Sequence, residues 1–422
     1  MDLVLAQIII SAIGQVLFVF FRTKTLNHPV FFFNIAFFLH NWSDLFVTYL
    51  TGEEVGVLIP TDITDRSIVT VAEFNLVAMW AFFIGACVLC RRDIAPRRIV
   101  HYKFDRFFGV YLFLSVCYAV YMFSSGQVGA SYGANQALTS SDAFSPIGTL
   151  LNARIILGAT YIIQKNKAGT KTIIIILTEL LFSMLLGGRK AFLIVVFAFL
   201  LPKVDKITFK TLFIALIALP LISFAVLFLN VFRSLSGLNI SFVDKIWLVS
   251  GIIMDNMEDL SLLLFMQLAS ASSEGVQCWT YMLIEEGRLP LMHGRTYLQA
   301  VINMFILRPF QGQVADWQAA YVFKSVAYPG VENMGYDFSF MSEALLNFGT
   351  SFYWIPYLFL GYFTKSVENR GQYNSAYMVF YYLIWCVLFI TFRTDSTSTF
   401  RYFSYFIFFW FIMNKLTIKL NR

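Results

Sequence analysis

The sequence contains little charge. Asp, Glu, Lys and Arg together make up 13% of the 422 residues, and 58% are hydrophobic, whereas soluble domains carry about 25% charged residues. A chain with so few charged side chains cannot cover its folded surface with polar groups. The composition therefore excludes an ordinary soluble domain and predicts an integral membrane protein.

Cysteines and short catalytic motifs are also scarce. Five cysteines are present, and only Cys278 lies in a substantial hydrophilic segment, so neither a disulfide framework nor a zinc site is predicted. Cys87 and Cys90 lie in an apolar run and are expected to be small buried residues. No serine-hydrolase elbow, phosphate-binding glycine loop or HExxH motif occurs, so a hydrolase, an ATPase or a metalloenzyme is not supported, and we expect no metal and no cofactor.

Apolar runs of about fifteen to twenty residues dominate the chain. Runs of this length favour helices over the strands of a membrane barrel, which alternate in segments of roughly ten residues. We predict an all-α polytopic membrane protein with about 11 transmembrane helices. The predicted spans are residues 3–21, 30–50, 69–90, 107–123, 147–163, two arms within 172–201, then 211–232, 351–363, 376–392 and 400–413.

The basic residues predict the orientation of these spans. Most of the 31 Lys and Arg residues fall in alternate connections, and the densest cluster, at 91–106, marks the cytoplasmic side. The connection 124–145 contains neither Lys nor Arg and is predicted to lie outside. The net charge of +6 is thus explained by topology and not by nucleic-acid binding. The N-terminus is expected outside and the C-terminus inside.

The division into regions follows from this topology. We predict an N-terminal transmembrane bundle over residues 1–232, one large loop over 233–350 on the outer face, and C-terminal transmembrane helices over 351–422. Within the loop, residues 252–268 and 297–306 are predicted to form amphipathic helices on the membrane surface, and Pro309 would end the second.

A glycine pair predicts a turn inside the apolar stretch 172–201. Lysines flank both ends of the stretch, so both ends are expected in the cytoplasm, and Gly187 and Gly188 permit the reversal. Each arm then spans about 22 Å against a hydrocarbon core of about 30 Å, which places the turn below the outer surface. Arg189 is therefore a functional candidate. The alternative is that Arg189 and Lys190 reach out to lipid phosphates.

The outer face is predicted to gather arginines although the positive-inside rule disfavours basic residues there. They are Arg189, Arg233, Arg288, Arg295, Arg308, Arg393 and Arg401. A guanidinium group is always charged and binds phosphate oxygens in a bidentate manner. A diphosphate that links a sugar chain to a polyprenol is the membrane-embedded anion that fits this set best, and two or three arginines would stabilise the leaving group. Singly, each arginine could equally be a surface or salt-bridge residue.

Activation of an acceptor hydroxyl group needs a base. The acidic candidates are Glu258, Asp259, Glu285, Glu286, Asp337, Glu343 and Asp395. Glu343 precedes a predicted span near the inferred site, although it could instead cap a helix or pair with an arginine. His293 is the one histidine of four on the predicted outer face, beside Gly294 and Arg295, and its alternative is an ordinary loop residue.

Three short segments together resemble the Wzy-type oligosaccharide repeat-unit polymerases, which polymerise O-antigen and capsule units. The segments are Gly-Gly-Arg-Lys-Ala at 187–191, Met-His-Gly-Arg-Thr-Tyr at 292–297 followed by Leu-Arg-Pro at 307–309, and Ser-Glu-Ala-Leu-Leu-Asn-Phe-Gly at 342–349. The similarity in topology covers most of the chain. The segment Met-Phe-Ile-Leu-Arg-Pro at 304–309 departs from the expected pattern.

The resemblance implies a GT-C-type glycosyltransferase of the bacterial inner membrane, with its active site facing the periplasm. Such an enzyme transfers a growing glycan from undecaprenyl pyrophosphate onto a new lipid-linked repeat unit. The resemblance implies a flippase and a chain-length regulator as partners. Arg189, Arg295 and Arg308 would contact the pyrophosphate, with His293, Arg295 and Glu343 as catalytic candidates. Arg393 and Arg401 join the binding set on topology alone.

Three alternatives remain open at this point. An O-antigen ligase uses the same donor and shares the arginines and a loop histidine, so His293 is compatible with it. Another lipid-linked glycosyltransferase is also compatible. A flippase for the same lipid is disfavoured because, apart from Arg154 and Glu179, the ionisable residues within spans lie on the predicted outer side.

Overall fold

The computed structural model describes residues 2–51, 64–90, 105–124, 146–186, 189–204, 224–225, 227–229, 231–232, 235, 242–255, 272–306, 312–330 and 338–420. Every regular element in these ranges is a helix. The first half contains α1 (Asp2–Thr23), α2 (Pro29–Asn41), α3 (Ser43–Thr51), α4 (Asp65–Ile84) with the π-helical turn η1 (Gly85–Leu89), α5 (Arg106–Ser124), α7 (Pro146–Lys165), α8 (Thr170–Leu186), α9 (Lys190–Leu200) and η2 (Leu201–Lys203). The second half contains α11 (Phe242–Asp255), α13 (Glu274–Glu285), α14 (Arg295–Phe305), η5 (Gly312–Trp317), α15 (Ala319–Ala327), α16 (Phe340–Phe352), α17 (Ile355–Gly371), α18 (Ser375–Thr391) and α19 (Ser396–Leu420).

Three of the described helices are long and apolar enough to cross a membrane. They cover Leu3–Thr23, Arg66–Leu89 and Arg106–Ser124, and α2 and α18 are shorter apolar helices. Large hydrophobic side chains stay exposed on these helices, for example Phe113 on α5 and Leu3 on α1. Such faces suit contact with lipid, whereas water would disfavour them.

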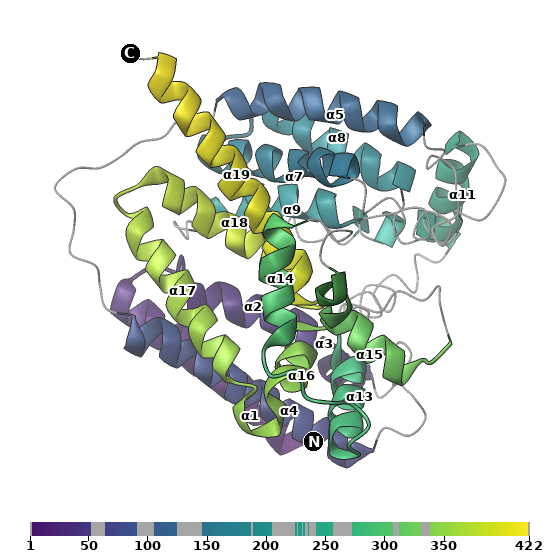
Figure 1. The fold of residues 1–422 in the computed structure, drawn as a ribbon, viewed down its shortest axis with the longest axis vertical. Coiled ribbons are helices and arrows are strands. Elements are labelled where there is room, and N and C mark those ends of the chain that lie inside the picture. The colour runs from purple at the N-terminus through teal and green to yellow at the C-terminus, as the bar shows by residue number, and fades with distance from the viewer. Residues whose placement is uncertain are drawn as a thin grey trace.

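The helices form two groups joined by α18 and α19 (Figure 1). Helices α5, α7, α8 and α9 lie side by side, and α1, α2, α4 and α17 pack on one another at the opposite end. Helix α18 contacts α9 and α7 on one side and α17 and α2 on the other, and it is almost entirely buried. The two groups therefore share one hydrophobic core, which contains residues of both.

Two glycines allow α4 and α17 to touch backbone to backbone. A Cβ atom on Gly85 would lie 2.1 Å from the Leu358 carbonyl oxygen, and one on Gly361 would lie 2.2 Å from the Phe82 carbonyl oxygen. Only a residue without a side chain fits so close to another backbone. This contact fixes the crossing of α4 and α17.

The predicted span over residues 30–50 is not one continuous helix, because the helix breaks at Trp42. Trp42 has φ −141° and ψ −1°, and α3 starts afresh at Ser43. The break frees the His40 carbonyl group, which accepts hydrogen bonds from the Ser273 N–H (2.9 Å) and the Ser273 hydroxyl (2.9 Å). A polar partner from the start of α13 thus replaces the helical hydrogen bond.

Buried amides extend this junction. The Gln277 side chain of α13 donates to Asn41 (2.5 Å) and accepts from Asn75 (2.9 Å). The His40 imidazole bonds the Phe389 carbonyl oxygen at 2.8 Å. Helix α13 is consequently tied to α2 and α4, and α2 in turn to α18, by polar contacts that sequence patterns did not indicate.

Other predicted boundaries are close to those observed. Helix α18 (Ser375–Thr391) matches the predicted 376–392, and α14 (Arg295–Phe305) matches the predicted 297–306. The reversal predicted within 172–201 is confirmed, since α8 ends at Leu186 and α9 begins at Lys190. Gly187, Gly188, the predicted span 211–232 apart from a few residues, and Pro309 lie outside the described residues.

Two further predictions need adjustment. The predicted amphipathic helix 252–268 is described only up to Asp255, where it belongs to a helix that begins earlier, at Phe242. The predicted span 351–363 corresponds to α17, which begins at Ile355 and continues to Gly371. A separate helix, α16, precedes it, and Gly349 marks a kink near its end with φ 62° and ψ −166°, a conformation reserved for glycine.

Candidate active site

A tight turn before α14 is joined to α16. The Met292 N–H donates to the Leu346 carbonyl (2.9 Å) and the His293 N–H donates to the Asn347 carbonyl (3.1 Å). His293 and Gly294 both have positive φ, 49° and 85°, which suits a compact reversal. Two segments singled out from sequence, 292–297 and 342–349, are therefore in direct contact.

Asn347 holds this turn with its side chain. Its Oδ1 atom accepts from the Gly294 N–H (2.9 Å), and its Nδ2 atom donates to the Thr296 hydroxyl (2.7 Å) and to the Glu343 carbonyl (2.8 Å). Asn347 is fully buried. The three bonds satisfy its amide and leave the turn little freedom.

Glu343 lies at the centre of the cluster, with no exposed surface. Its Oε1 atom accepts from the Thr296 hydroxyl (2.6 Å) and the Ser396 hydroxyl (2.8 Å), and its Oε2 atom accepts from the Ser396 N–H (2.6 Å). The carboxyl group therefore joins the first turns of α14 and α19 to α16. Burial, and secondly the nearby Asp395, raise the pKa of Glu343 to about 7.

Asp395, immediately before α19, is the second buried carboxyl group. Its Oδ2 atom accepts from the Gln318 side chain at 3.1 Å. Burial raises the pKa of Asp395, whereas hydrogen bonds from Gln318 and from the backbone N–H groups of Ala320 and Ser398, together with the charge of Arg401, act in the opposite direction. The N–H groups belong to the first turns of α15 and α19, where a carboxylate is favoured.

The two candidates His293 and Arg295 are exposed beside this buried core. The Arg295 guanidinium carbon lies 5.7 Å from the centre of the Trp317 ring, a cation–π distance. Both residues stand on the turn that Asn347 and Glu343 hold. Buried carboxyl groups thus support an exposed edge that carries an imidazole and a guanidinium group.

The other arginines proposed to bind the pyrophosphate lie on different elements. Arg393 and Arg401 are half-buried at the end of α18 and in the second turn of α19, and Arg401 acts electrostatically on Asp395. Arg189 is half-buried at the start of α9, which packs on α7, α8 and α18. Arg308 lies outside the described residues. The structure thus brings Glu343, His293, Arg295, Arg393 and Arg401 to adjoining elements, with Arg189 on a separate helix pair.

Thr296, Asn347 and Ser396 were not predicted as members of the site. Thr296 and Asn347 lie within the segments 292–297 and 342–349, and Ser396 lies in the polar link 393–399. The sequence therefore indicated the right segments, but it did not indicate which residues in them hold the site together. Arg154 and Glu179, the two ionisable residues predicted to lie deep within spans, form an ion pair. The Nη2 atom of Arg154 lies 3.2 Å from the Oε2 atom of Glu179.

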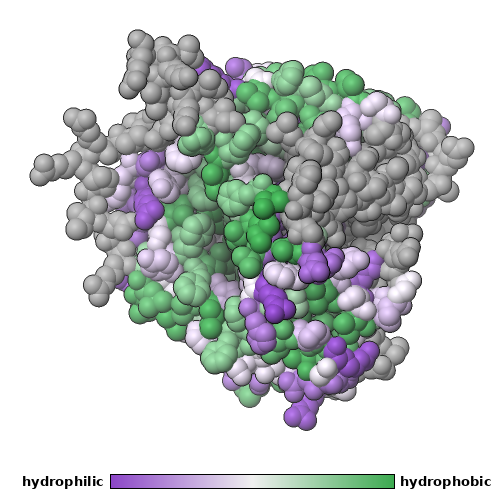
Figure 2. Space-filling model, viewed as in Figure 1, coloured by the Kyte–Doolittle hydropathy of each residue, from purple (hydrophilic) through white to green (hydrophobic). Residues whose placement is uncertain are grey.

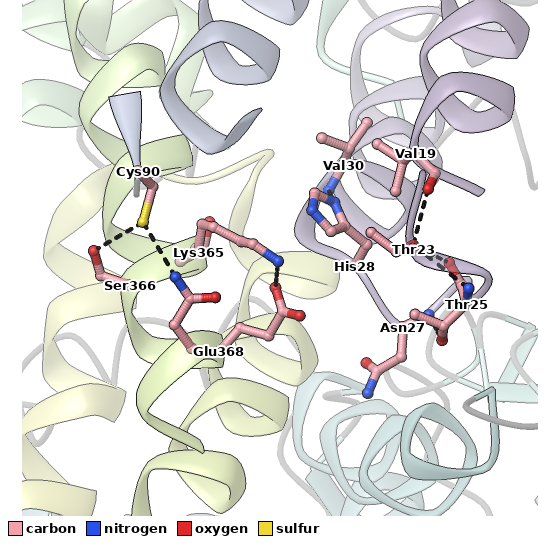
Figure 3. Close-up of polar contacts among 12 residues, drawn as sticks. Val19, Thr23, Thr25, Asn27, His28, Val30, Cys90, Lys365, Ser366 and Glu368 are labelled. Carbon is pink, nitrogen blue, oxygen red and sulfur yellow. Dashed lines mark hydrogen bonds and ion pairs between the residues drawn. The ribbon is translucent and has the colours of Figure 1, made fainter. Parts of the chain in front are cut away.

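A second polar cluster lies where α4 and α17 end, between α17 and the turn from α1 to α2 (Figure 3). Lys365 pairs with Glu368 at 2.6 Å, and the Cys90 sulfur lies 3.4 Å from the Ser366 hydroxyl. Cys87 and Cys90 are half-buried, and not fully buried as expected, although these contacts join Cys90 to α17. No group of three or more His, Cys, Asp or Glu side chains able to hold a metal ion occurs in the described part of the chain.

The family model for the O-antigen polysaccharide polymerase Wzy matches residues 2–420. The chain belongs to this family. No curated protein and no solved structure matches it. Membership implies a membrane-integral polymerase of O-antigen repeat units that acts on lipid-linked oligosaccharides, in agreement with the apolar helices described above.

For a Wzy polymerase, the cluster supplies the group types that glycosyl transfer needs. Exposed or half-buried guanidinium groups can hold an anionic leaving group, and an exposed imidazole can accept a proton. Both oxygen atoms of Glu343 accept hydrogen bonds within the protein. Asp395 accepts hydrogen bonds from the backbone at the starts of α15 and α19. These carboxyl groups hold the exposed groups in place more readily than they reach a substrate themselves.

Proposed function

We propose that this Wzy-family chain joins undecaprenyl-pyrophosphate-linked oligosaccharide repeat units at the periplasmic face of the bacterial inner membrane. The growing glycan would be transferred as a block onto a new lipid-linked unit. The observation that carries the proposal is the meeting of three polar segments, 292–297, 342–349 and 393–399, in one hydrogen-bonded cluster of a chain that matches the Wzy family over residues 2–420.

In the proposed reaction, a sugar hydroxyl oxygen of the new unit attacks the anomeric carbon of the donor glycan. The bond between that carbon and the diphosphate oxygen breaks, and undecaprenyl pyrophosphate leaves with the electron pair. His293, which is exposed, takes the hydroxyl proton. An imidazole suits this role because its unprotonated ring nitrogen can accept a proton.

The arginines serve the diphosphate in this proposal. Arg295, Arg393 and Arg401 adjoin the cluster. Arg189, at the start of α9, would contact the diphosphate from a separate helix pair, and Arg308 keeps the role suggested by its motif. Fixed guanidinium charges stabilise the negative charge that develops on the leaving diphosphate. No metal is needed for that step if two or three of them converge.

Glu343 acts as a positioning residue in this scheme. Both of its oxygen atoms accept hydrogen bonds from Thr296 or Ser396, so a substrate hydroxyl would reach it only through those hydroxyl groups. Its function is then to hold the turn with His293 and Arg295 against the start of α19. The sequence-based role of Glu343 as a base is replaced by this one.

The wider setting is part of the same proposal. Residues 1–232 and 351–422 would form transmembrane bundles of a GT-C-type enzyme around the periplasmic region 233–350. Undecaprenyl-linked substrates would enter from the bilayer, supplied by a flippase, and a chain-length regulator would limit the product. Breaks in helices, such as those at Trp42 and Gly349, suit a bundle that must admit an extended substrate.

Replacement of Arg189 or Arg295 by Ala tests the proposal in cells. We expect each variant to insert normally but to yield surface glycan with a single repeat unit on its core, seen on a gel in place of a ladder. Arg288→Ala is the matched control, because Arg288 is exposed in the same loop and pairs with Glu286 at 3.1 Å; it should keep the ladder.

Long chains in both Arg189→Ala and Arg295→Ala would contradict the binding of diphosphate by these residues. Loss of all glycan, including the single capped unit, would instead indicate a ligase or a flippase. The two outcomes are separated on the same gel.

A further inference from the structure

Arg154 and Glu179 form an ion pair inside the helical bundle. The Nη2 atom of Arg154, on α7, lies 3.2 Å from the Oε2 atom of Glu179, on α8, and the two side chains are 2% and 0% exposed. The other carboxylate oxygen of Glu179 accepts from the Tyr111 hydroxyl at 3.2 Å. Both members of the pair are therefore withdrawn from lipid and from water.

Aromatic rings enclose the guanidinium group. Its central carbon lies 3.7 Å from the centre of the Tyr118 ring and 4.8 Å from that of Phe182. Its Nη1 atom bonds Asn152 at 3.2 Å, while its Nε atom has no hydrogen-bond partner among the described residues. Burial of an ion pair is unfavourable enough that apolar residues of similar volume often stabilise a fold equally well. Ionisable residues at such depth usually serve function.

Helix α7, which carries Arg154, packs on both α9 and α19, the helices that carry two proposed diphosphate ligands. Helix α8 continues from Glu179 for about two turns to Leu186, and Arg189 follows the reversal. On its other side, α7 packs on α19, which carries Arg401. Exposed residues such as Leu177 and Leu181 leave α8 at the edge of the bundle. There it packs on α9 through apolar side chains and is tied to α7 and α5 by the polar contacts of Glu179.

We propose that the Arg154–Glu179 ion pair is a positioning element of the transfer site, which sets the spacing between Arg189 on the α8–α9 reversal and Arg401 on α19. The inference rests on the proposed role of these two arginines in holding the donor diphosphate. Two guanidinium groups bind the same diphosphate well only within a limited range of separations, so their spacing affects binding.

The double replacement Arg154→Met with Glu179→Leu tests the pair, because it removes both charges and keeps similar volume. We expect unchanged or raised thermal stability of the purified protein in detergent. We expect the apparent KM for lipid-linked repeat units to rise about ten-fold, the effect of one weakened charge-assisted hydrogen bond. The control is Lys365→Met with Glu368→Leu, an ion pair remote from the site, which should leave KM unchanged.

A mutant cycle then separates this inference from the proposed function. The cycle is read as the Kd for lipid-linked repeat units, because Arg189→Ala is expected to make no polymer. If the pair acts through the arginines, its replacement adds little to the loss of binding already caused by Arg189→Ala or Arg401→Ala. A folded double variant with wild-type KM, or effects that add fully in both backgrounds, would overturn the inference. Arg189→Ala and Arg401→Ala variants with wild-type Kd would overturn the proposed function instead.

If the double variant fails to fold, the charge-swapped pair Arg154→Glu with Glu179→Arg takes its place. Restored folding with a raised KM supports a positioning role, since the charges are kept but the geometry changes. Restored folding with an unchanged KM contradicts it.

Discussion

At the scale of single residues, Glu343 combines complete burial with a carboxyl group that titrates near neutrality. Both oxygen atoms are used by Thr296 and Ser396, yet burial and the neighbouring Asp395 raise its pKa to about 7. A carboxyl group held in this way responds to pH without contacting solvent. The residue joins three helices, so its charge affects the stability of the site as a whole.

The stability of the protein should fall as pH rises through this range. The folded-state pKa of Glu343 is raised above its ordinary value of 4.5, so the folded chain binds more protons than the unfolded chain between about pH 4.5 and 7. The stabilisation by neutral Glu343 is fully present below about pH 4.5 and is lost as pH passes about 7, a change of about 3 kcal/mol. Thermal unfolding of the purified protein across pH 4 to 8 measures it.

Glu343→Gln isolates this effect. The amide keeps the shape and can still accept from the Ser396 N–H, so the variant should lose much of the pH dependence in this window. Asp395→Asn should shift the fall to lower pH because a neighbouring negative charge is removed. An identical pH profile in wild type and Glu343→Gln would show that another group titrates.

Asn347 should be intolerant of a change to Asp. The carboxylate can accept from the Gly294 N–H but cannot donate to Thr296 or to the Glu343 carbonyl, and it places a buried charge beside an oxygen atom. We expect a loss of about 2 kcal/mol or more in the free energy of unfolding, together with loss of polymer.

The matched control for that change is Asn166→Asp. Asn166 is exposed and has φ 43°, a conformation that Asp also tolerates, so the effect should stay within about 0.5 kcal/mol. Equal melting temperatures for the two variants would argue against a central role for the Asn347 amide.

At the scale of helices, the contact of α4 with α17 depends on glycine. Gly361→Ala would place a methyl group 2.2 Å from the Phe82 carbonyl oxygen, so the helices must separate, at a cost of about 1–3 kcal/mol. Gly109→Ala on α5 meets no atom within 4 Å and should stabilise by about 0.5–1 kcal/mol. Melting temperatures in detergent compare the two, and a neutral Gly361→Ala would mean that the close contact is absent.

Helices with long uninterrupted apolar runs could be predicted from sequence. Helices α5, α7 and α18 begin and end within a residue or two of the predicted limits, because hydrophobic length and flanking basic or polar residues determine them. The break at Trp42 could not be predicted in this way. It depends on Ser273, more than 200 residues later, which satisfies the freed carbonyl group. The start of α13 likewise depends on contacts distant in sequence.

At the scale of the whole molecule, apolar side chains cover much of the face seen in Figure 2, and hydrophilic residues gather mainly at its lower and left edges. This distribution agrees with a chain that meets lipid over a wide surface. The composition predicted this apolar surface, because a chain with few charged residues must expose apolar side chains to lipid. The buried polar pairs within the bundle could not be predicted, because the sequence shows their members only as isolated polar residues in apolar runs.

The arrangement of the candidate site could not be predicted from sequence, because it depends on how distant helices pack. The sequence indicated three polar segments and a set of arginines, but about fifty residues separate Thr296 from Glu343 and Glu343 from Ser396. No local pattern connects positions so far apart, and only the packing of α14, α16 and α19 brings them together. The alignment of the arginines with a diphosphate stays a prediction.

Polymerisation by this chain alone can be tested on the isolated protein with its proposed substrate. Purified protein in detergent or lipid vesicles, incubated with lipid-linked repeat units alone, should lengthen them into a ladder of glycans and release undecaprenyl pyrophosphate, and Arg295→Ala should not. A protein that binds the units yet leaves their length unchanged, in the absence of any other enzyme or acceptor, would contradict the central claim.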